Sequence, residues 1–560
     1  MANEGAKAAT SDRRPAEGRR TPRGTPKGRQ VEPAALAAVR ALLGTAPRRR
    51  DLLIEHLHRI NDAEGRLSLR MLAALAAEMS LSYAEVYEVA TFYAHFEIAG
   101  DDAPPALPVL RICDGVACMI AGAEAKLAHA RRALDGLAKV EPAPCIGACD
   151  HAPAVANGFR RLAGEPTVVS PAQLRADAPA ATPPVEPAGA GAQWQGCRRG
   201  ERTPEQVFAV LDESGLRGLG GAGFPTGRKW RLVAEQPGPR LMAVNADEGE
   251  PGTFKDRWFL EAEPHRVLEG ALIAAWATGC EAIYFYVRDE YPEAREILAA
   301  TVEAWRRDGR LGDIRVELRR GAGAYVCGEE SAMLESLEGK RGLPRHKPPF
   351  PAQRGLFGRP TLINNVETLW WIPALLAKGG AWFASQGRRG GKGLRAFSLS
   401  GRVARPGVKI APAGITVREL VDEHGGGMLP GHRFKAYLPG GASGGILPAA
   451  MGDLPLDFGK LEPHGCFVGS GAVVVFSDRD DLRAIARNLV RFFEHESCGQ
   501  CTPCRVGTEK AGGLIAGQTW DAPLLGELAK AMADASICGL GQAAMNPVLS
   551  LMRHFPEELS

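Results

Sequence analysis

Residues 498–504 read Cys-Gly-Gln-Cys-Thr-Pro-Cys, and one further cysteine, Cys538, follows in the same C-terminal region. This spacing lets one short loop present three thiolates to three corners of an iron–sulfur cubane, while a distant thiolate closes the fourth corner. Zinc knuckles usually consist of separate Cys-x-x-Cys pairs, so zinc is the second interpretation and unliganded thiols are the third. The pattern therefore predicts a [4Fe–4S] cluster held by Cys498, Cys501, Cys504 and Cys538.

A second set of four cysteines lies nearer the N-terminus as two pairs, Cys113 with Cys118 and Cys145 with Cys149. Each pair sits at a turn beside a predicted strand or helix. Four thiolates with no histidine at ligand spacing suit a [2Fe–2S] rhomb or a structural zinc ion, and disulfide pairing is the remaining interpretation. Because no secretory signal precedes them, clustered cysteines favour a metal centre over disulfides.

A glycine-rich stretch over residues 218–230 reads Gly-Leu-Gly-Gly-Ala-Gly-Phe-Pro-Thr-Gly-Arg-Lys-Trp. Its glycines free backbone N–H groups to meet a phosphate, and Arg228 and Lys229 add positive charge. No apolar strand runs directly into it, so the dinucleotide-binding fingerprint is not met. A glycine-rich turn without a ligand stays open as the alternative.

Four further stretches carry polar or aromatic groups that suit a ligand. Residues 245–252 hold three carboxylates within a few positions, which would repel one another without partners. The others are residues 321–330, the Lys347-Pro-Pro-Phe350 segment and the pair Asn364-Asn365. A solvated acidic turn, buried amides or packed aromatic rings would each explain one of these stretches taken singly.

Changes of pattern divide the 560 residues into successive regions. We expect a disordered basic tail over 1–30, a helical bundle over 31–100, a small α/β domain over 107–177, a linker over 178–200, a helix-and-strand domain over 201–393, a small β-rich domain over 394–477 and a helical domain over 478–560. Ser82 and Glu85 form an expected helix-capping box, and Thr167–Ser170 is an expected strand. The fold class is therefore multidomain α/β.

Bulk composition excludes several classes of protein. The net charge of +3 gives no basic field for nucleic acid. The most apolar candidate for a membrane span, residues 267–287, contains two glutamates and reads as a buried helix followed by a strand. The twelve histidines show no metal-ligand spacing, so none is assigned to a metal. We expect a cytoplasmic protein that binds neither membrane nor nucleic acid.

These stretches, in this order, resemble the NADH-binding flavoprotein subunit of respiratory complex I and its soluble diaphorase relatives. Residues 201–560 resemble that flavoprotein, and residues 31–177 resemble the separate thioredoxin-like [2Fe–2S] subunit. The resemblance implies a thioredoxin-like ferredoxin domain, a Rossmann-like FMN domain, a β-grasp-like domain and a helical [4Fe–4S] domain. The closest resemblance over the full length is to the beta subunit of molybdenum- or tungsten-dependent, NAD-linked formate dehydrogenase.

The resemblance also implies site residues. Its FMN phosphate loop matches Gly218, Gly220, Gly221 and Lys229. Its isoalloxazine and ribityl contacts match Asn245, Asp247, Glu248, Tyr325, Gly328, Glu329, Asn364 and Asn365. The positions that hold NAD against the flavin match Phe224, Glu250, Glu330, Lys347 and Phe350. No side chain is expected to act as acid or base, because the flavin itself exchanges hydride with NAD.

The implied function is that of a diaphorase subunit. A partner catalytic subunit would oxidise formate at a molybdenum or tungsten centre, and electrons would pass through iron–sulfur clusters and FMN to NAD+. A heterodimer or larger hetero-oligomer is expected. The rivals are the diaphorase subunit of an NAD-reducing hydrogenase, a complex I fusion and, from another class, a zinc-stabilised scaffold without redox function.

Overall fold

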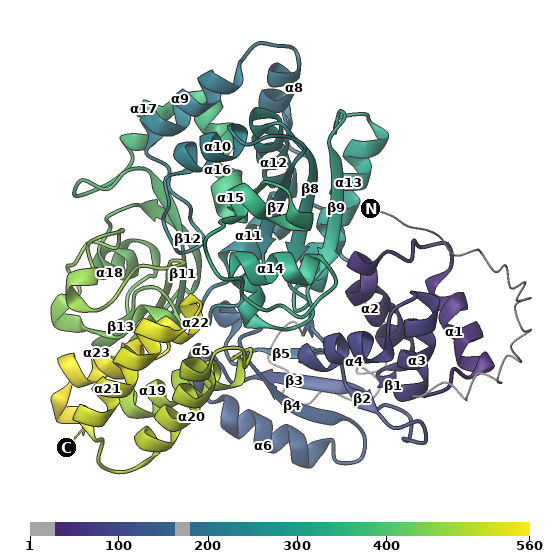
Figure 1. Cartoon of the computed structure of the whole chain (residues 1–560). Coiled ribbons are helices and arrows are strands. Elements are labelled where there is room, and N and C mark those ends of the chain that lie inside the picture. The colour runs from purple at the N-terminus through teal and green to yellow at the C-terminus, as the bar shows by residue number, and fades with distance from the viewer. Residues whose placement is uncertain (1–28, 163–179, 560) are drawn as a thin grey trace, which may run out of the picture.

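The computed structural model describes residues 29–162 and 180–559. The basic tail expected over 1–30, apart from its last two residues, and the strand expected over Thr167–Ser170 lie outside the described residues. In Figure 1 the N-terminal helices and the C-terminal helices lie at opposite sides of the molecule, with a parallel sheet and its helices between and above them.

The N-terminal region is a small helical bundle closed by a two-stranded parallel ribbon. Its elements are α1 Pro33–Leu43, α2 Leu53–Glu64, β1 Leu67–Ser68, α3 Leu69–Glu78, α4 Tyr83–Phe92 and β2 Ile98–Ala99. The capping box is confirmed, since the Ser82 hydroxyl accepts from the Glu85 N–H at 3.2 Å and the Ser82 N–H donates to the Glu85 carboxylate at 3.0 Å. This box starts α4 at the expected residue.

The next region is a four-stranded sheet in the order β4-β3-β5-β6, with helices beside it. Its elements are β3 Val109–Cys113, α5 Val116–Ile120, α6 Ala123–Ala133, β4 Lys139–Ala143, β5 Val155–Asn157 and β6 Arg160–Arg161. Strand β3 pairs parallel with β4 and antiparallel with β5. The cysteines of the first set therefore lie at one end of this sheet, at or after the ends of β3 and β4.

The central region is built on a four-stranded, all-parallel sheet in the order β10-β7-β8-β9. Its strands are β7 Arg240–Ala246, β8 Cys280–Val287, β9 Arg315–Arg320 and β10 Thr361–Asn365. Its helices are α8 Ala192–Arg198, α9 Pro204–Ser214, α10 Thr226–Ala234, α11 Lys255–Ala262, α12 Pro264–Thr278, α13 Pro292–Arg307, α14 Glu330–Leu337, α15 Pro351–Arg354, α16 Val366–Lys378 and α17 Gly380–Ala384. The interpretation of residues 267–287 as a buried helix followed by a strand is confirmed by α12 and β8.

The β-rich region is a five-stranded mixed sheet in the order β12-β11-β15-β13-β14. Its elements are β11 Leu394–Gly401, β12 Gly407–Pro412, α18 Val417–Glu419, β13 Phe434–Leu438, β14 Leu447–Pro448 and β15 Ala472–Ser477. Strand β15, whose six residues are all buried, lies at the centre of this sheet.

The chain ends in a helical region that packs below the β-rich sheet (Figure 1). Its helices are α19 Leu482–His495, α20 Thr502–Ala516, α21 Ala522–Ala535, α22 Gly539–Ala543 and α23 Asn546–His554. The α19 side chain of Asn488 donates to the backbone carbonyl of Asp114 at 2.8 Å, which joins this region to the N-terminal sheet.

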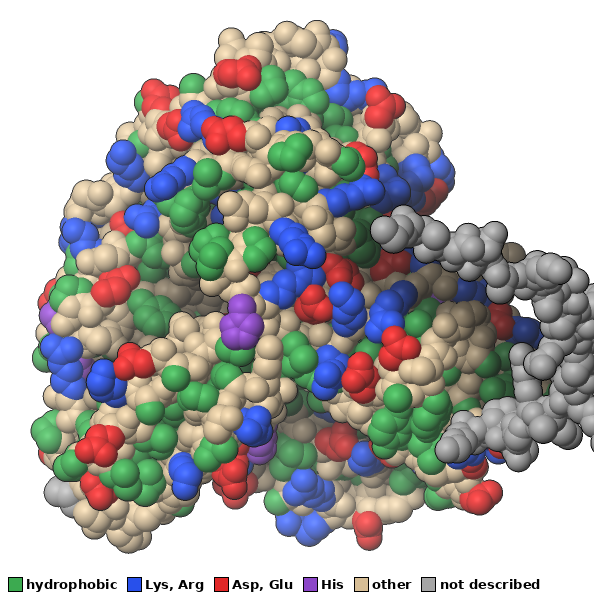
Figure 2. Space-filling model, in the orientation of Figure 1, with side chains coloured by type: hydrophobic (Ala, Val, Ile, Leu, Met, Phe, Trp, Pro, Cys, Tyr) green, Lys and Arg blue, Asp and Glu red, His purple; other side chains and the backbone are tan. Residues whose placement is uncertain are grey.

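The face seen in Figure 2 carries lysine and arginine side chains interspersed with aspartate and glutamate. Within the described residues, no helix combines the length and the apolar character needed to cross a bilayer.

Candidate functional site

The carboxyl ends of β7 and β10 meet the glycine-rich loop that joins α9 to α10. Asn245 lies in register with Asn365, so both amides reach the same edge of the sheet. The loop approaches this edge so closely that a Cβ on Gly220 would lie 3.0 Å from the Cβ of Asn365. Parallel α/β sheets bind ligands at the carboxyl ends of their strands, so this edge is the candidate cofactor cradle.

Two buried polar groups in the cradle are left unsatisfied by the described parts of the chain, and a half-buried lysine there lacks a carboxylate partner. Asp247 Oδ2 and Asn364 Nδ2 are buried without a hydrogen-bond partner there. The Lys229 ammonium donates to the Ile363 carbonyl at 3.2 Å but forms no salt bridge with a described carboxylate. Burial lowers the pKa of Lys229 and raises the pKa of Asp247 well above its usual range.

This donor set fits FMN. A half-buried ammonium beside a glycine-rich loop suits a phosphate, because both supply positive potential. An unpaired amide and an unpaired carboxyl suit polar groups of a flavin, because buried polar atoms without partners cost free energy.

Three of the predicted cofactor residues use their side chains to cap helices. The Glu248 carboxylate accepts two N–H groups in the first turn of α11, at 2.7 and 3.1 Å. Asn365 caps α16 in the same way, and Glu329 accepts two N–H groups of α14, both at 2.9 Å. Burial raises the pKa of Glu248 to about 8. These side chains stabilise the first turns of the helices around the cradle. Their direct contact with a flavin stays a prediction.

Glu250 ties the acidic loop to the β-rich region. Its carboxylate accepts the N–H and the hydroxyl of Ser443, both at 2.7 Å, and the hydroxyl of Tyr325. Burial raises the pKa of Glu250. Three donors fix the position of this carboxylate, and a group that orients a ligand needs a fixed position.

The residues other than Glu250 that are predicted to hold NAD are at least partly exposed. Lys347 pairs with Glu329 at 2.9 Å and with Glu330 at 2.6 Å. The charges of Glu330 and Lys347 are close enough to Lys229 to shift its pKa in opposite directions. Phe350 and Phe224 are 54% and 37% exposed, so both rings present apolar surface on which a planar ligand can pack.

The first cysteine set comes together in the N-terminal sheet. Cys113 ends β3, Cys118 lies in α5, and Cys145 and Cys149 follow β4. All four side chains are buried, and the sulfurs of Cys145 and Cys149 are 3.3 Å apart without a disulfide bond. Four buried free thiols in one small domain suit a [2Fe–2S] cluster.

The second set lines one pocket in the C-terminal region, with Cys498, Cys501, Cys504 and Cys538 around it. Cys501 and Cys504 stand at the start of α20, where the helix dipole favours negative charge. Val326, which follows Tyr325 directly, lines the same pocket. The Asn245 amide of the cradle donates to the Gly328 carbonyl at 2.8 Å, so the pocket of the second cysteine set and the cradle share the segment Tyr325–Gly328.

Two residues that the sequence analysis missed link the cradle to the first cysteine set. The buried Arg288 donates to the Glu248 carbonyl at 2.7 Å and to the Cys145 carbonyl at 2.9 Å. Tyr291 donates to the Glu248 carboxylate at 3.0 Å, and its ring would clash with a Cβ on Gly147. The sequence feature that could have identified Arg288 and Tyr291 is their position directly after the apolar residues of β8.

We predict that the anaerobically prepared chain contains about one FMN and roughly six iron atoms, the sum of one [2Fe–2S] and one [4Fe–4S] cluster. Metal analysis and flavin release measure both numbers. Stoichiometric zinc with little iron would contradict both cluster predictions.

We predict that Glu250→Gln weakens nucleotide binding by about 1–2 kcal/mol, toward the lower end for a hydrogen bond to a charged group, without changing FMN content. The amide keeps the size of the side chain but cannot accept from all three of its donors. Titration with NAD+ and NADH measures the effect. Unchanged affinity for both nucleotides would remove Glu250 from the nucleotide site.

Four family models match the chain. They are the thioredoxin-like [2Fe–2S] ferredoxin over residues 39–160, the Nuo51 FMN-binding domain over 211–374, the SLBB domain over 397–447 and the NADH-ubiquinone oxidoreductase-F iron-sulfur binding region over 484–560. These matches confirm the multidomain α/β fold and the presence of FMN-, [2Fe–2S]- and [4Fe–4S]-binding regions.

The chain is also similar to individual proteins. It is 43% identical to a NADH-quinone oxidoreductase subunit of Rhizobium meliloti (strain 1021), over 66% of this chain and 92% of the relative. It is 44% identical to the corresponding NADH-quinone oxidoreductase subunit of Rhodobacter capsulatus, over 63% of this chain and 86% of the relative. A chain in the crystal structure of air-oxidised NAD+-reducing [NiFe]-hydrogenase matches with a TM-score of 0.78 and 34% identity, covering 92% of this chain and 94% of that chain.

Proposed function

We propose a function from one premise: the chain belongs to the family of NADH-oxidising flavoproteins that includes these NADH-quinone oxidoreductase subunits. It is accordingly an electron-transfer subunit with FMN- and iron–sulfur-binding regions, and part of a multisubunit oxidoreductase. Our proposal is that it serves as the NAD+-reducing diaphorase of a complex whose partner subunit houses the substrate centre.

One observation carries this proposal, namely the extent of the match. The two NADH-quinone oxidoreductase relatives align with 63–66% of the chain, whereas the hydrogenase chain aligns with 92% of it. The match to the hydrogenase chain therefore extends over the N-terminal helices and the [2Fe–2S] region as well. This shared domain arrangement supports an NAD+-reducing hydrogenase complex as the first candidate.

A formate dehydrogenase complex is the second candidate. The sequence resembles the beta subunit of NAD-linked formate dehydrogenase across essentially its full length. Both candidates give this chain the same role and differ only in the metal centre of the partner, which is nickel and iron in one case and molybdenum or tungsten in the other.

The chain's own residues have distinct tasks in this proposal. Lys229 and the glycine-rich loop hold the phosphate of FMN, and Asp247 and Asn364 meet its polar groups. Glu250, Glu330, Lys347 and the two exposed phenylalanines orient the nicotinamide nucleotide. When bound, FMN and the clusters supply the exchange between two-electron hydride chemistry and one-electron transfer.

Isolation of the native complex with metal analysis tests the proposal. We expect a second, larger subunit with nickel, or with molybdenum or tungsten, and NAD+ reduction driven by hydrogen or by formate respectively. The isolated full chain with its cofactors should reduce ferricyanide with NADH, yet should reduce NAD+ with neither hydrogen nor formate. A complex of membrane subunits without such a partner would contradict the proposal, as would substrate oxidation by the isolated chain.

A further inference from the structure

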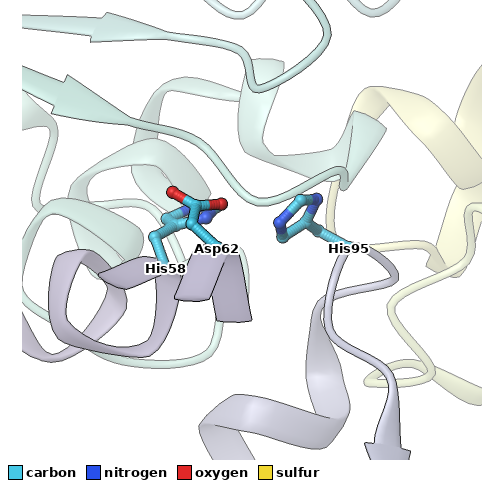
Figure 3. Close-up of side chains that lie close together, drawn as sticks. All are labelled: His58, Asp62 and His95. Atoms are coloured by element: carbon cyan, nitrogen blue, oxygen red, sulfur yellow. The ribbon is translucent and has the colours of Figure 1, made fainter. Parts of the chain in front are cut away.

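Three side chains at the seam between the N-terminal helices and the parallel sheet bring their ligand atoms together. His58 and Asp62 project from α2, one helical turn apart, toward His95 in the loop after α4 (Figure 3). One nitrogen from each histidine and one carboxylate oxygen all lie within 4.8 Å of one another. The sequence showed no metal-ligand spacing here, because 37 positions separate His58 from His95 and only the fold brings them together.

The tautomer of His58 follows from its surroundings. Its Nε2 lies 2.8 Å from the Gly321 carbonyl oxygen, which can only accept, so Nε2 carries the proton. Nδ1 then holds a free lone pair. This atom is buried and lacks a hydrogen-bond partner among the described residues, and the residue as a whole is 2% exposed. A buried acceptor without a partner costs free energy that a ligand would recover.

His95 is oriented by a carboxylate instead of a carbonyl. Its Nδ1 lies 2.6 Å from a carboxylate oxygen of the fully buried Asp289, which favours the tautomer with the proton on Nδ1. Nε2 then accepts a hydrogen bond from the Asn61 amide at 3.3 Å, and a bound cation takes the place of that amide. Metal-binding histidines typically donate their other N–H to a carbonyl or a carboxylate in this way, which fixes the ring and its tautomer.

Asp62 completes the set from the solvent side. Its side chain is 52% exposed, so a cation can enter over it and keep a water ligand. Arg320 donates to both oxygens of the Asp62 carboxylate and also pairs with Asp289, so a cation at this site shares the carboxylate with the guanidinium. Carboxylates that bind metals are commonly held in place by hydrogen bonds of this kind.

We propose that His58 Nδ1, His95 Nε2 and the Asp62 carboxylate bind a divalent transition-metal cation, zinc in the first instance. Two imidazoles, one carboxylate and an open position form a donor set that zinc takes in proteins. Zinc–nitrogen distances of about 2.0–2.1 Å place tetrahedral ligands ~3.3 Å apart, so the site closes by roughly an ångström on binding.

The site joins two regions of the chain. All three ligands come from the N-terminal helical region, whereas the groups that orient them, Gly321, Asp289 and Arg320, follow or end strands β8 and β9. A bound cation therefore cross-links α2 to the loop after α4, at a place where both are held by groups of the parallel sheet. It is expected to raise the apparent melting temperature by a few degrees, because it binds only the folded state.

Zinc titration of the full chain tests the proposal, with FMN and both clusters assembled and adventitious metal removed by a chelator. Wild-type protein should bind one zinc ion per chain beyond its iron. Asp62→Asn and His95→Gln should each weaken this binding at least about 100-fold, since each removes a ligand. The exposed pair His129→Gln and Asp135→Asn, outside the cluster, are the matched controls and should bind as wild type.

Cobalt(II) supplies a second readout. A site of two histidines and one aspartate gives visible d–d bands without a thiolate-to-cobalt charge-transfer band. A thiolate band, zinc binding that Asp62→Asn leaves unchanged, or no zinc beyond the iron would each overturn the proposal. Because Asp62 is exposed, Asp62→Asn is expected to fold, and it tests the site even if His95→Gln does not fold. NADH–ferricyanide activity is measured separately, so failure of this site is distinguishable from failure of the proposed function.

Discussion

Cys501→Ser is expected to abolish electron exchange with the partner subunit while NADH oxidation by ferricyanide continues. Cys501 lies at the start of α20 and lines the pocket shared by the four cysteines of the second set. A serine at this corner removes one of four thiolates, and a cubane with three protein ligands is not expected to survive purification. The side chains proposed to meet FMN, Lys229, Asp247 and Asn364, lie on α10, after β7 and on β10, outside the C-terminal helices, so bound FMN should remain.

The measurements are the [4Fe–4S] EPR signal, FMN content and the two activities. Partner-coupled NAD+ reduction should fall to background, and the NADH–ferricyanide rate should stay near that of wild type. Cys118→Ser is the matched control, because it removes a thiolate of the first set in a separate sheet and should eliminate only the [2Fe–2S] signal. If either single change removed both EPR signals from folded protein, the two-site layout would be wrong.

Local patterns in the sequence were enough to predict the parts of the fold that local physics decides. The Ser82–Glu85 box starts a helix wherever it stands, because its reciprocal hydrogen bonds involve only neighbouring residues. Cysteines three positions apart lie within one short segment in any fold, so the spacing of Cys498, Cys501 and Cys504 alone indicated a shared site.

Interactions between distant segments could not be predicted from spacing. Arg288 bridges the carbonyls of Cys145 and Glu248, which are 103 residues apart, and neither carbonyl has a sequence signature. The cluster of His58 and His95 is hidden for the same reason. Glu248 and Glu329 show a different limit, since a carboxylate that meets a ligand and one that caps a helix look alike in the sequence.

Two lysines near the cradle should respond in opposite ways to the same substitution. Lys255 is 1% exposed and pairs with Asp256 at 2.8 Å and with Glu367 at 3.0 Å, which raises the pKa of its ammonium. Lys229 is half-buried and has no salt bridge in the described parts of the chain, and loss of hydration lowers its pKa. Carboxylates of the protein therefore neutralise the ammonium of Lys255, whereas the ammonium of Lys229 can pair with a bound anion.

Lys255→Met should therefore destabilise the flavin-free chain by about 3–5 kcal/mol, because it leaves two buried carboxylates without their cation. Lys229→Met should leave the flavin-free chain at least as stable as wild type, since it removes a partly desolvated charge that no described carboxylate neutralises. Lys229→Met should instead weaken FMN binding by about 1.5–3 kcal/mol, or roughly 10–150-fold, because a charged contact to phosphate is lost.

Denaturation of the flavin-free proteins and fluorescence titration with FMN separate the two effects. An FMN affinity that Lys229→Met leaves unchanged would show that the phosphate binds elsewhere, and a stability loss equal to that of Lys255→Met would show that the protein itself already neutralises Lys229.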